Sequence, residues 1–176
     1  MRRMRRYSII SLMALCLAVA APGIFHWRTV TIPRERCAAN LRILWIATKI
    51  YSPVQGEGYP PSFQDMMLLV RDPRYFICPG SGHKPGPTND VGSWTDYGYI
   101  SGLKEDDPSG CVLAFCPPEH HGGRGANVLQ IEGLVRWYPR DEFSRVTNSS
   151  TVMFGTGDTN VLQRLGRMTR MMRPKH

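Results

Sequence analysis

The feature that most constrains this chain is a stretch of nineteen residues near the N-terminus, 7–25, that contains no charged side chain. As a helix rising about 1.5 Å per residue, the stretch would be about 28 Å long, close to the thickness of the hydrocarbon core of a bilayer. Four of the six residues before it are arginines, and no comparable cluster directly follows it. By the positive-inside rule, the sequence predicts a single-pass inner-membrane protein, with residues 1–6 in the cytoplasm, a transmembrane helix over 7–25 and the rest of the chain outside the cytoplasm.

A cleaved signal peptide is the alternative interpretation of the same stretch. Ala18 and Ala20, followed by Ala21, fit the small-x-small pattern at which a signal peptidase cuts after an apolar region. Cleavage there would release a soluble protein, whereas an uncleaved span would anchor it. Both interpretations export the remainder of the chain.

The net charge of +8 is located at the two ends of the chain. Nine of the 22 basic residues lie within 1–6 and 159–176, and these two segments contain no acidic residue. Residues 7–158 therefore hold 13 basic and 14 acidic side chains, a net charge of −1. Because binding to nucleic acid depends on many basic contacts with phosphate, we expect no nucleic-acid partner.

The length of 176 residues fits one domain of ordinary size with appendages, since single domains most often have about 100 to 150 residues. We assign an exported domain to residues 26–143 and a basic C-terminal tail to residues 144–176. From Asp158 onward, apolar side chains and arginines recur at helical spacing, so the tail can form an amphipathic helix.

Hydrophobic periodicity predicts a helix over residues 33–51, with Pro33 in its first turn. A shorter helix is expected over residues 63–70, where Ser62 can cap the first turn. The apolar face of the longer helix would carry Cys37, Leu41, Leu44, Thr48 and Tyr51.

Strands are expected over residues 97–100 and 111–115, and a hairpin over residues 127–138. Glu132 and Gly133 form the turn of this hairpin, because Gly133 can adopt the positive φ that a two-residue turn demands. Helices and strands that are segregated in this way predict an α+β fold, with the N-terminal helix packed on a small antiparallel sheet.

Several short blocks of the sequence resemble a pseudopilin family, the proteins similar to the type II secretion system protein G. Cys-x-x-Asn-Leu-Arg begins at Cys37, Phe-x-Cys-Pro ends at Pro79, and residues 121–137 resemble the block His-Gly-Gly...Asn-Val-Leu-x-x-Asp-Gly-His-Val-x-Trp. Residues 6–12 resemble a degenerate prepilin signal. The residues of the third block that carry a structural motif are His121, Gly122, Gly123, Asn127, Glu132 and Gly133.

The resemblance implies a pilin-like fold and a non-catalytic role as a structural or assembly component of a bacterial secretion or pilin system. It implies the inner membrane and other pseudopilin or secretion-system subunits as partners, and neither a cofactor nor a small-molecule substrate. Arg6 stands where the prepilin peptidase requires Gly, and Ser11 stands where the family has Glu. We therefore expect that the peptidase does not cut this chain and that the chain alone forms no filament.

Cysteine usage also fits an exported domain. Apart from Cys16 in the apolar stretch, the cysteines number four, which is even and allows three disulfide connectivities. Export favours disulfide formation, and Cys37 and Cys78 each lie in one of the blocks that resemble the family. We therefore expect a disulfide between these two cysteines, with buried free thiols as the alternative. Five residues of extended chain would separate Cys111 and Cys116 by about 17 Å, too far for a disulfide unless the chain turns back.

Glu119, His120 and His121 form the one cluster that is typical of metal or acid–base chemistry. Adjacent histidines on an extended segment point to opposite sides, and no third ligand stands at a recognisable spacing. We therefore interpret His121 as a structural residue that bonds to the backbone of the Gly122–Gly123 loop, and we assign neither catalytic nor metal-ligating residues. A soluble periplasmic binding module and a small metal-dependent hydrolase using His120 or His121 remain the alternative functions.

Overall fold

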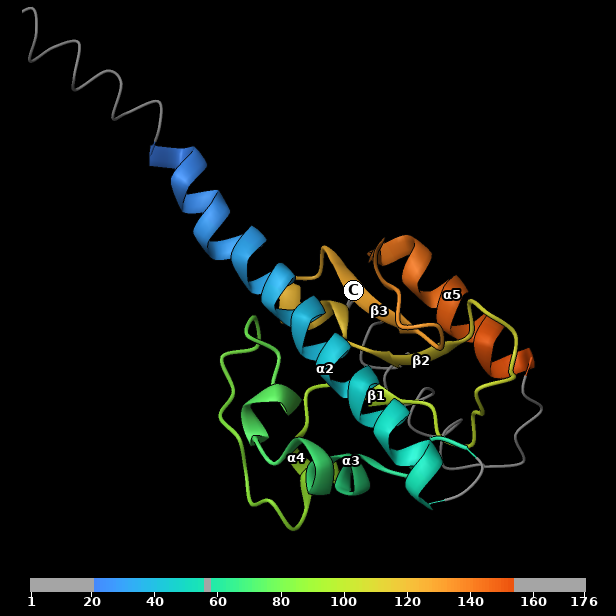
Figure 1. The fold of residues 1–176 in the computed structure, drawn as a ribbon. Coiled ribbons are helices and arrows are strands. Elements are labelled where there is room, and N and C mark those ends of the chain that lie inside the picture. The colour runs from blue at the N-terminus through green and yellow to red at the C-terminus, as the bar shows by residue number, and fades with distance from the viewer. Residues whose placement is uncertain (1–20, 56–57, 154–176) are drawn as a thin grey trace, which may run out of the picture.

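The computed structural model describes residues 21–55 and 58–153, and it shows an α+β fold. A long helix lies along a four-stranded sheet, and a second helix near the C-terminus lies beside the same sheet (Figure 1). The elements in chain order are η1 (Trp27–Thr31), α2 (Ile32–Gln55), α3 (Phe63–Val70), η2 (Pro73–Phe76), α4 (Val91–Trp94), β1 (Gly98–Tyr99), β2 (Val112–Phe115), η3 (Pro118–His121), β3 (Gly125–Gln130), β4 (Val135–Pro139) and α5 (Arg140–Met153).

The sheet is an antiparallel meander in which spatial order follows chain order, β1-β2-β3-β4. All six residues of β3 are buried, as expected for a central strand that is covered on both faces. On one face, the Asn127 amide donates to the Arg34 carbonyl of α2. On the other face, the rings of Phe115 and Phe143 of α5 meet edge to face at 5.4 Å. The predicted fold class is therefore confirmed at the level of a helix on an antiparallel sheet.

The long helix has the predicted buried face but different ends. Cys37, Leu41, Leu44 and Thr48 are all at most 1% exposed, as the periodicity requires, whereas Tyr51 at the end of the predicted face is only half-buried. Instead of beginning near Pro33, the helix continues upstream through η1, and residues 21–26 are also helical. Pro33 has no N–H to donate to the Thr29 carbonyl, and its ring crowds that carbonyl, which explains why the turn before it widens into a π-helix.

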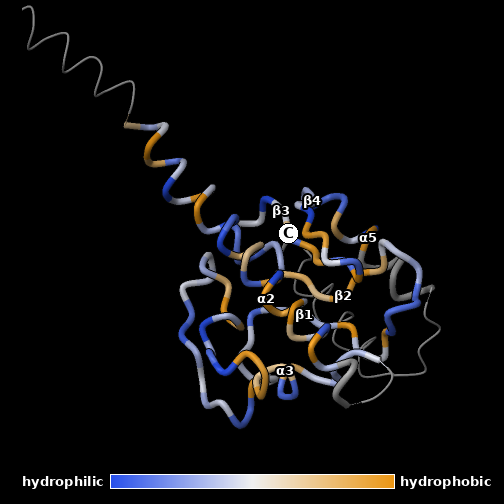
Figure 2. Tube along the Cα trace, viewed as in Figure 1, coloured by the Kyte–Doolittle hydropathy of each residue, from blue (hydrophilic) through white to orange (hydrophobic). Residues whose placement is uncertain are grey.

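Residues 21–29 of this helix are all exposed and project beyond the body of the domain (Figure 1). Apolar and polar segments alternate along the projection, whereas apolar segments gather where α2 and α3 face the sheet (Figure 2). Ile24, Phe25 and Trp27 are 55%, 70% and 55% exposed. The part of the helix from Cys37 onward therefore contributes to the core, whereas residues 21–29 pack against no other element among the described residues.

The short helix and the hairpin follow the sequence closely. α3 has Ser62 as its N-cap, and the Ser62 side chain accepts a hydrogen bond from the Asp65 amide. β3 and β4 form the predicted hairpin, and Gly133 in its turn has a φ of 90°. Local chemistry is sufficient in both places, because a cap and a tight turn each need only neighbouring residues.

The prediction of a single-pass inner-membrane protein needs correction. Among residues 21–55 and 58–153, no helix is both long enough and apolar enough to cross a bilayer. α2 fails because arginines and a lysine recur along it, for example Arg34, Arg42 and Lys49. Most of the predicted span, residues 7–20, lies outside the described residues, as do the prepilin-like segment and the proposed tail helix from Asp158. α5 runs across the boundary we assigned between residues 143 and 144.

Candidate metal centre

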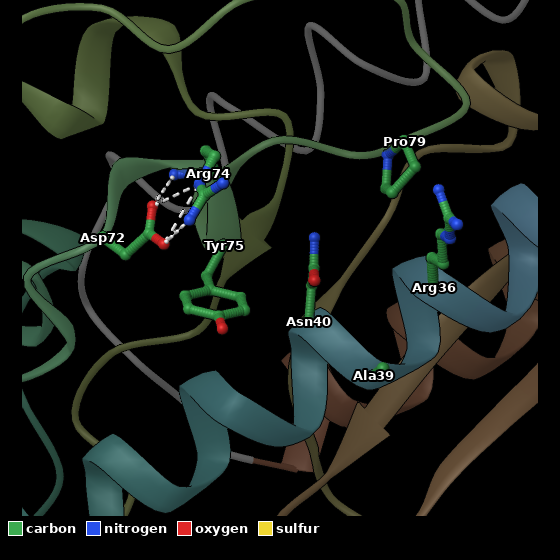
Figure 3. A pocket seen from close by; sticks show the side chains of 7 residues that line it. All are labelled: Arg36, Ala39, Asn40, Asp72, Arg74, Tyr75 and Pro79. Atoms are coloured by element: carbon green, nitrogen blue, oxygen red, sulfur yellow. Dashed lines mark hydrogen bonds and ion pairs between the residues drawn. The ribbon is translucent and has the colours of Figure 1, made fainter.

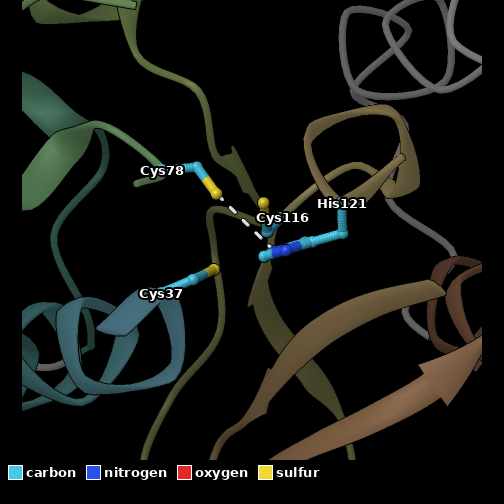
Figure 4. Close-up of side chains that lie close together, drawn as sticks. All are labelled: Cys37, Cys78, Cys116 and His121. Atoms are coloured by element: carbon cyan, nitrogen blue, oxygen red, sulfur yellow. Dashed lines mark hydrogen bonds between the residues drawn. The ribbon is translucent and has the colours of Figure 1, made fainter. Parts of the chain in front are cut away.

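Four side chains from four separate segments converge beside the long helix (Figure 4). Cys37 lies on α2, Cys78 follows η2, Cys116 follows β2, and His121 ends η3. One ligand atom from each, a Sγ or an imidazole nitrogen, lies within 4.8 Å of all the others. The three cysteines are 0% exposed, and His121 is partly buried at the edge of the site.

A tight turn presents Cys78 to the other ligands. The Cys78 amide donates to Asp96 Oδ2 at 2.9 Å, which fixes the backbone, and the Gly80 amide donates to Cys78 Sγ at 3.4 Å. Ser81 Oγ donates to Asp96 Oδ2 at 2.5 Å and so closes the turn onto the same carboxylate. The sulfur is thereby held as a hydrogen-bond acceptor, the role that a thiolate ligand needs.

Glycine is required at position 80 because two loops touch there. A Cβ built on Gly80 would lie 2.2 Å from the His120 carbonyl oxygen and 3.3 Å from His121 Nδ1. No side chain fits into such a gap, so any other residue would push the Cys78 turn away from η3. The close approach of these two backbones brings Cys78 Sγ to 3.6 Å from His121 Nε2.

His121 is oriented by the sheet and by the helix. Its ring meets the Trp137 ring edge to face at 5.3 Å, and the Arg34 guanidinium lies 4.4 Å from the centre of the Trp137 ring. Gly122 follows η3 with a φ of 66°, a left-handed conformation that ends the turn. The imidazole therefore points toward Cys78 and not toward the Gly122–Gly123 backbone.

The three thiols perturb one another strongly. Hydrogen bonds from Cys116 and then Cys78 lower the pKa of Cys37 to about 4, with smaller contributions from Asn127 and Tyr97. A hydrogen bond from Cys116 also lowers the pKa of Cys78, whereas burial raises the pKa of Cys116 well above its ordinary value. Cys37 opposes the effect of Cys116 on Cys78, so the two thiols with lowered pKa values compete for the same stabilisation.

A second group of polar side chains adjoins the cluster. His83 Nδ1 lies 2.7 Å from Asp96 Oδ1, and His120 Nε2 lies 3.7 Å from the same oxygen. His120 Nδ1 lies 3.6 Å from Cys116 Sγ. The Asp96 side chain is 3% exposed, that of His120 17% and that of His83 62%, so the group leads from the buried thiols to the surface.

A shallow pocket of about 360 Å³ lies between α2 and η2 (Figure 3). Its charged side chains are Arg36 on the helix and the Asp72–Arg74 ion pair, whose guanidinium donates to both carboxylate oxygens. None of the residues around it is a nucleophile with an adjacent base. Its lining residues are Arg36, Ala39, Asn40, Asp72, Arg74, Tyr75 and Pro79.

The predicted disulfide between Cys37 and Cys78 is not present, because all four described cysteines are free thiols. The two residues do come together, as the sequence suggested, but Cys116 and His121 meet them there. Cys111 is buried at the start of β2 and lies outside the cluster, so the cysteines are divided into three and one and not into two pairs.

The interpretation of His121 as a loop residue without metal-ligand partners is also corrected. His120 and His121 lie in a 3-10 turn and not on an extended segment, so the two rings can approach the same cluster from one loop. The sequence did not predict Cys116, His83 and Asp96 as members of these groups. Cys116 and His121 stand five positions apart on either side of a Pro-Pro turn, and this spacing was the one local signal available.

The other residues of the His-Gly-Gly block have structural roles. Asn127, which is 2% exposed, donates to the Arg34 carbonyl at 2.8 Å. Glu132 Oε2 accepts from the Gly110 amide at 3.0 Å, and a Cβ on Gly133 would lie 2.6 Å from the Trp45 ring. Gly123 has a φ of 71°.

Comparison with known proteins yields no matching family model, no similar curated protein and no similar solved structure. The candidate site therefore depends on the geometry of this chain alone.

Proposed function

We propose that this chain is a non-catalytic, pseudopilin-like structural or assembly component of a secretion or pilin system. One observation carries the proposal: a single helix packs on an antiparallel sheet with residues 32–51, while residues 21–29 project from the domain with apolar side chains exposed. Such a helix can join its domain to a neighbouring subunit without any change in the domain.

Contacts among the blocks that resemble the family support the proposal. The Asn40 amide of the first block donates to the Ile77 carbonyl of the second at 3.0 Å. Asn127 of the third block donates to the carbonyl of Arg34, three residues before the first block begins. Two asparagines of these blocks thus hold the long helix, one through the segment after η2 and one through β3, and both donate to backbone carbonyls.

The outer surface of the helix offers a place for a partner. Ile46 and Ile50 are 46% and 49% exposed, four residues apart on the face that turns away from the sheet. Ile24, Phe25 and Trp27 form a second exposed apolar group on the projecting part of the same helix. The partner that fits this surface is another subunit with a long apolar helix, because two such helices can interdigitate side by side.

Burial of the thiol cluster supports the non-catalytic part of the proposal. Its three cysteines have no exposed surface, so a substrate has no path to their sulfurs without local unfolding. We therefore assign the cluster to the architecture of the domain and not to turnover.

Site-specific photo-crosslinking in cells that express the full-length chain tests the proposed function. With a photoreactive residue at position 25, we expect adducts with a second copy or with another helix-bearing subunit. The matched control places the same residue at exposed position 136 on β4, where adducts with that partner should be absent. Equal crosslinking of one partner from positions 25 and 136 would contradict an assembly role for the helix. Adducts from position 25 with only unrelated abundant proteins would contradict it as well.

A further inference from the structure

We propose that Cys37, Cys78, Cys116 and His121 form a closed, tetrahedral binding site for one structural Zn²⁺ ion. The site would join α2, the turn after η2, the end of β2 and η3 through a single ion. The inference concerns the domain itself and does not depend on its role in assembly.

The spacing of the four ligand atoms fits zinc. With Zn–S bonds of about 2.3 Å and a Zn–N bond of about 2.0 to 2.1 Å, tetrahedral geometry places sulfurs about 3.8 Å apart and a sulfur about 3.6 Å from the nitrogen. Cys78 Sγ and His121 Nε2 are 3.6 Å apart, and no pair in the cluster exceeds 4.8 Å. An ion at the centre thus requires only a small contraction of the remaining distances.

The composition of the cluster favours a metal over a disulfide. Three sulfurs meet, so any disulfide between two of them would leave the third as a buried thiol beside the imidazole. A metal ion uses all four groups at once. Three thiolates and one imidazole form a ligand set that selects Zn²⁺ over oxygen-preferring ions such as Mg²⁺ or Ca²⁺, and four protein ligands leave no position open for substrate.

Surrounding groups are arranged to support the thiolates. The Gly80 amide donates to Cys78 Sγ, and His120 Nδ1, when protonated, donates to Cys116 Sγ at 3.6 Å. Asp96 bonds to the Cys78 amide and faces His120 Nε2 at 3.7 Å, so one carboxylate positions the loops of two ligands. Donors of this kind spread the net negative charge of a Zn(Cys)₃His centre and orient its ligands.

His83, Asp96 and His120 could be taken as a second metal site, because their ligand atoms also lie within 4.8 Å of one another. The contacts of Asp96 and His120 indicate instead that these two residues position the ligands of the zinc site. Both oxygens of Asp96 already have partners, the Cys78 amide and Ser81 hydroxyl on one and His83 on the other. We assign Asp96 and His120 as positioning residues of the zinc site.

The metal content of the full-length protein tests the proposal. Protein produced in medium supplemented with zinc, and purified without chelator, should contain one Zn²⁺ per chain by elemental mass spectrometry. Replacement of zinc by Co²⁺ should give the intense visible absorption of tetrahedral cobalt with thiolate ligands. A folded protein without metal, iron in place of zinc, or a mapped Cys37–Cys78 disulfide in protein isolated without reductant would overturn the assignment.

Variants locate the ion and keep the test independent of folding. Cys78→Ser and His121→Ala should each reduce bound zinc at least tenfold, whereas His121→Cys should keep one zinc because it converts the site to four thiolates. Cys111→Ser is the matched control, since this cysteine is buried but lies outside the cluster, and it should bind zinc as the unchanged protein does. Loss of zinc in Cys111→Ser, or its full retention in both Cys78→Ser and His121→Ala, would overturn the ligand set.

Asp96→Asn tests the positioning residues. It should retain one zinc per chain but bind it about 10- to 100-fold more weakly in competition with a chromophoric chelator, as expected when an outer hydrogen-bond partner is removed. His83→Ala removes the mostly exposed partner of Asp96 Oδ1 and should weaken zinc binding less than Asp96→Asn does, because the Cys78 amide and the Ser81 hydroxyl still hold Asp96 Oδ2. Two zinc ions in the unchanged protein and one in His83→Ala would show a second metal site and overturn the assignment of Asp96 as a positioning residue.

Discussion

The long helix is attached to the sheet at two places that differ in how they are built. Near Cys37, the attachment involves four segments of chain and three buried thiols. Near Trp45, it involves one indole, whose N–H donates to the Ile131 carbonyl at 3.0 Å and whose ring covers Gly133. The Trp45 attachment needs only protein groups, whereas the Cys37 attachment brings together four side chains that one metal ion could bind at once. One helix can therefore combine packing and metal binding, and the two attachments should respond differently to the same treatments.

Removal of the metal should have the largest effect. If zinc joins the Cys37 attachment, a strong chelator should lower the free energy of unfolding by about 5 kcal/mol, because structural zinc adds its binding energy to the folded state. For a domain of this size, the Tm measured by circular dichroism should fall by roughly 15 °C. His121→Ala should already have the lower Tm and show no further response to chelator. An unchanged Tm in the unmodified protein would show that packing alone holds both attachments.

Gly133→Ala should have the next largest effect, at the Trp45 attachment. Its φ of 90° is strained for any other residue, and the new Cβ would meet the Trp45 ring at 2.6 Å. We expect a loss of about 2 to 3 kcal/mol in urea unfolding, with zinc content unchanged.

Gly92→Ala is the control for that substitution, because this glycine lies in α4 with open space around it and without a positive φ. It should change stability by less than about 0.5 kcal/mol. A loss of zinc in Gly133→Ala would show that the two attachments are coupled and not separate.

Asn127→Ala should have an intermediate effect at the Cys37 attachment. The buried amide donates to the Arg34 carbonyl at 2.8 Å, and its removal takes away this bond between β3 and α2, at a cost of about 1 to 2 kcal/mol. Asn40→Ala, at a half-buried position that bonds to the Ile77 carbonyl, should cost less because water can replace the amide. If both variants lose the same unfolding free energy in equilibrium urea unfolding, burial does not determine how much these two hydrogen bonds contribute.

Glu105→Gln should have the smallest effect. Lys49 of α2 bonds to Glu105 at 2.5 Å near the Trp45 attachment, but the Glu105 side chain is 65% exposed. Exposed ion pairs contribute little, so the change in unfolding free energy should stay below about 0.5 kcal/mol and vanish in high salt. A larger loss that persists in high salt would mean that Glu105 also positions the Lys49 ammonium over the Trp45 and Tyr59 rings.

Each attachment could be predicted only in part: the turn at Gly133 for the first, and for the second the approach of Cys37 and Cys78 but not the addition of Cys116 and His121. Gly133 stands in a turn between two strand-like runs, and its positive φ follows from neighbouring residues alone. The period of Cys37, Leu41, Leu44 and Thr48 likewise gave the buried face of the helix. By contrast, Cys37, Cys78 and Cys116 are separated by about forty residues each, and no local pattern specifies which of them meet.

By itself, the sequence determined the elements whose physics is local: the amphipathic face of α2, the Ser62 cap of α3 and the tight turn between β3 and β4. Only the tertiary structure decided that the cysteines divide into three and one, that His121 and not a fourth cysteine completes the cluster, and that Asp96 binds the turn of Cys78. The reason is that periodicity and turn chemistry act over a few residues, whereas a ligand set depends on how distant segments pack. At position 80, this packing requires glycine. Because Gly80 has no Cβ, the Cys78 turn and η3 can lie close enough for Cys78 Sγ to contact the His121 imidazole.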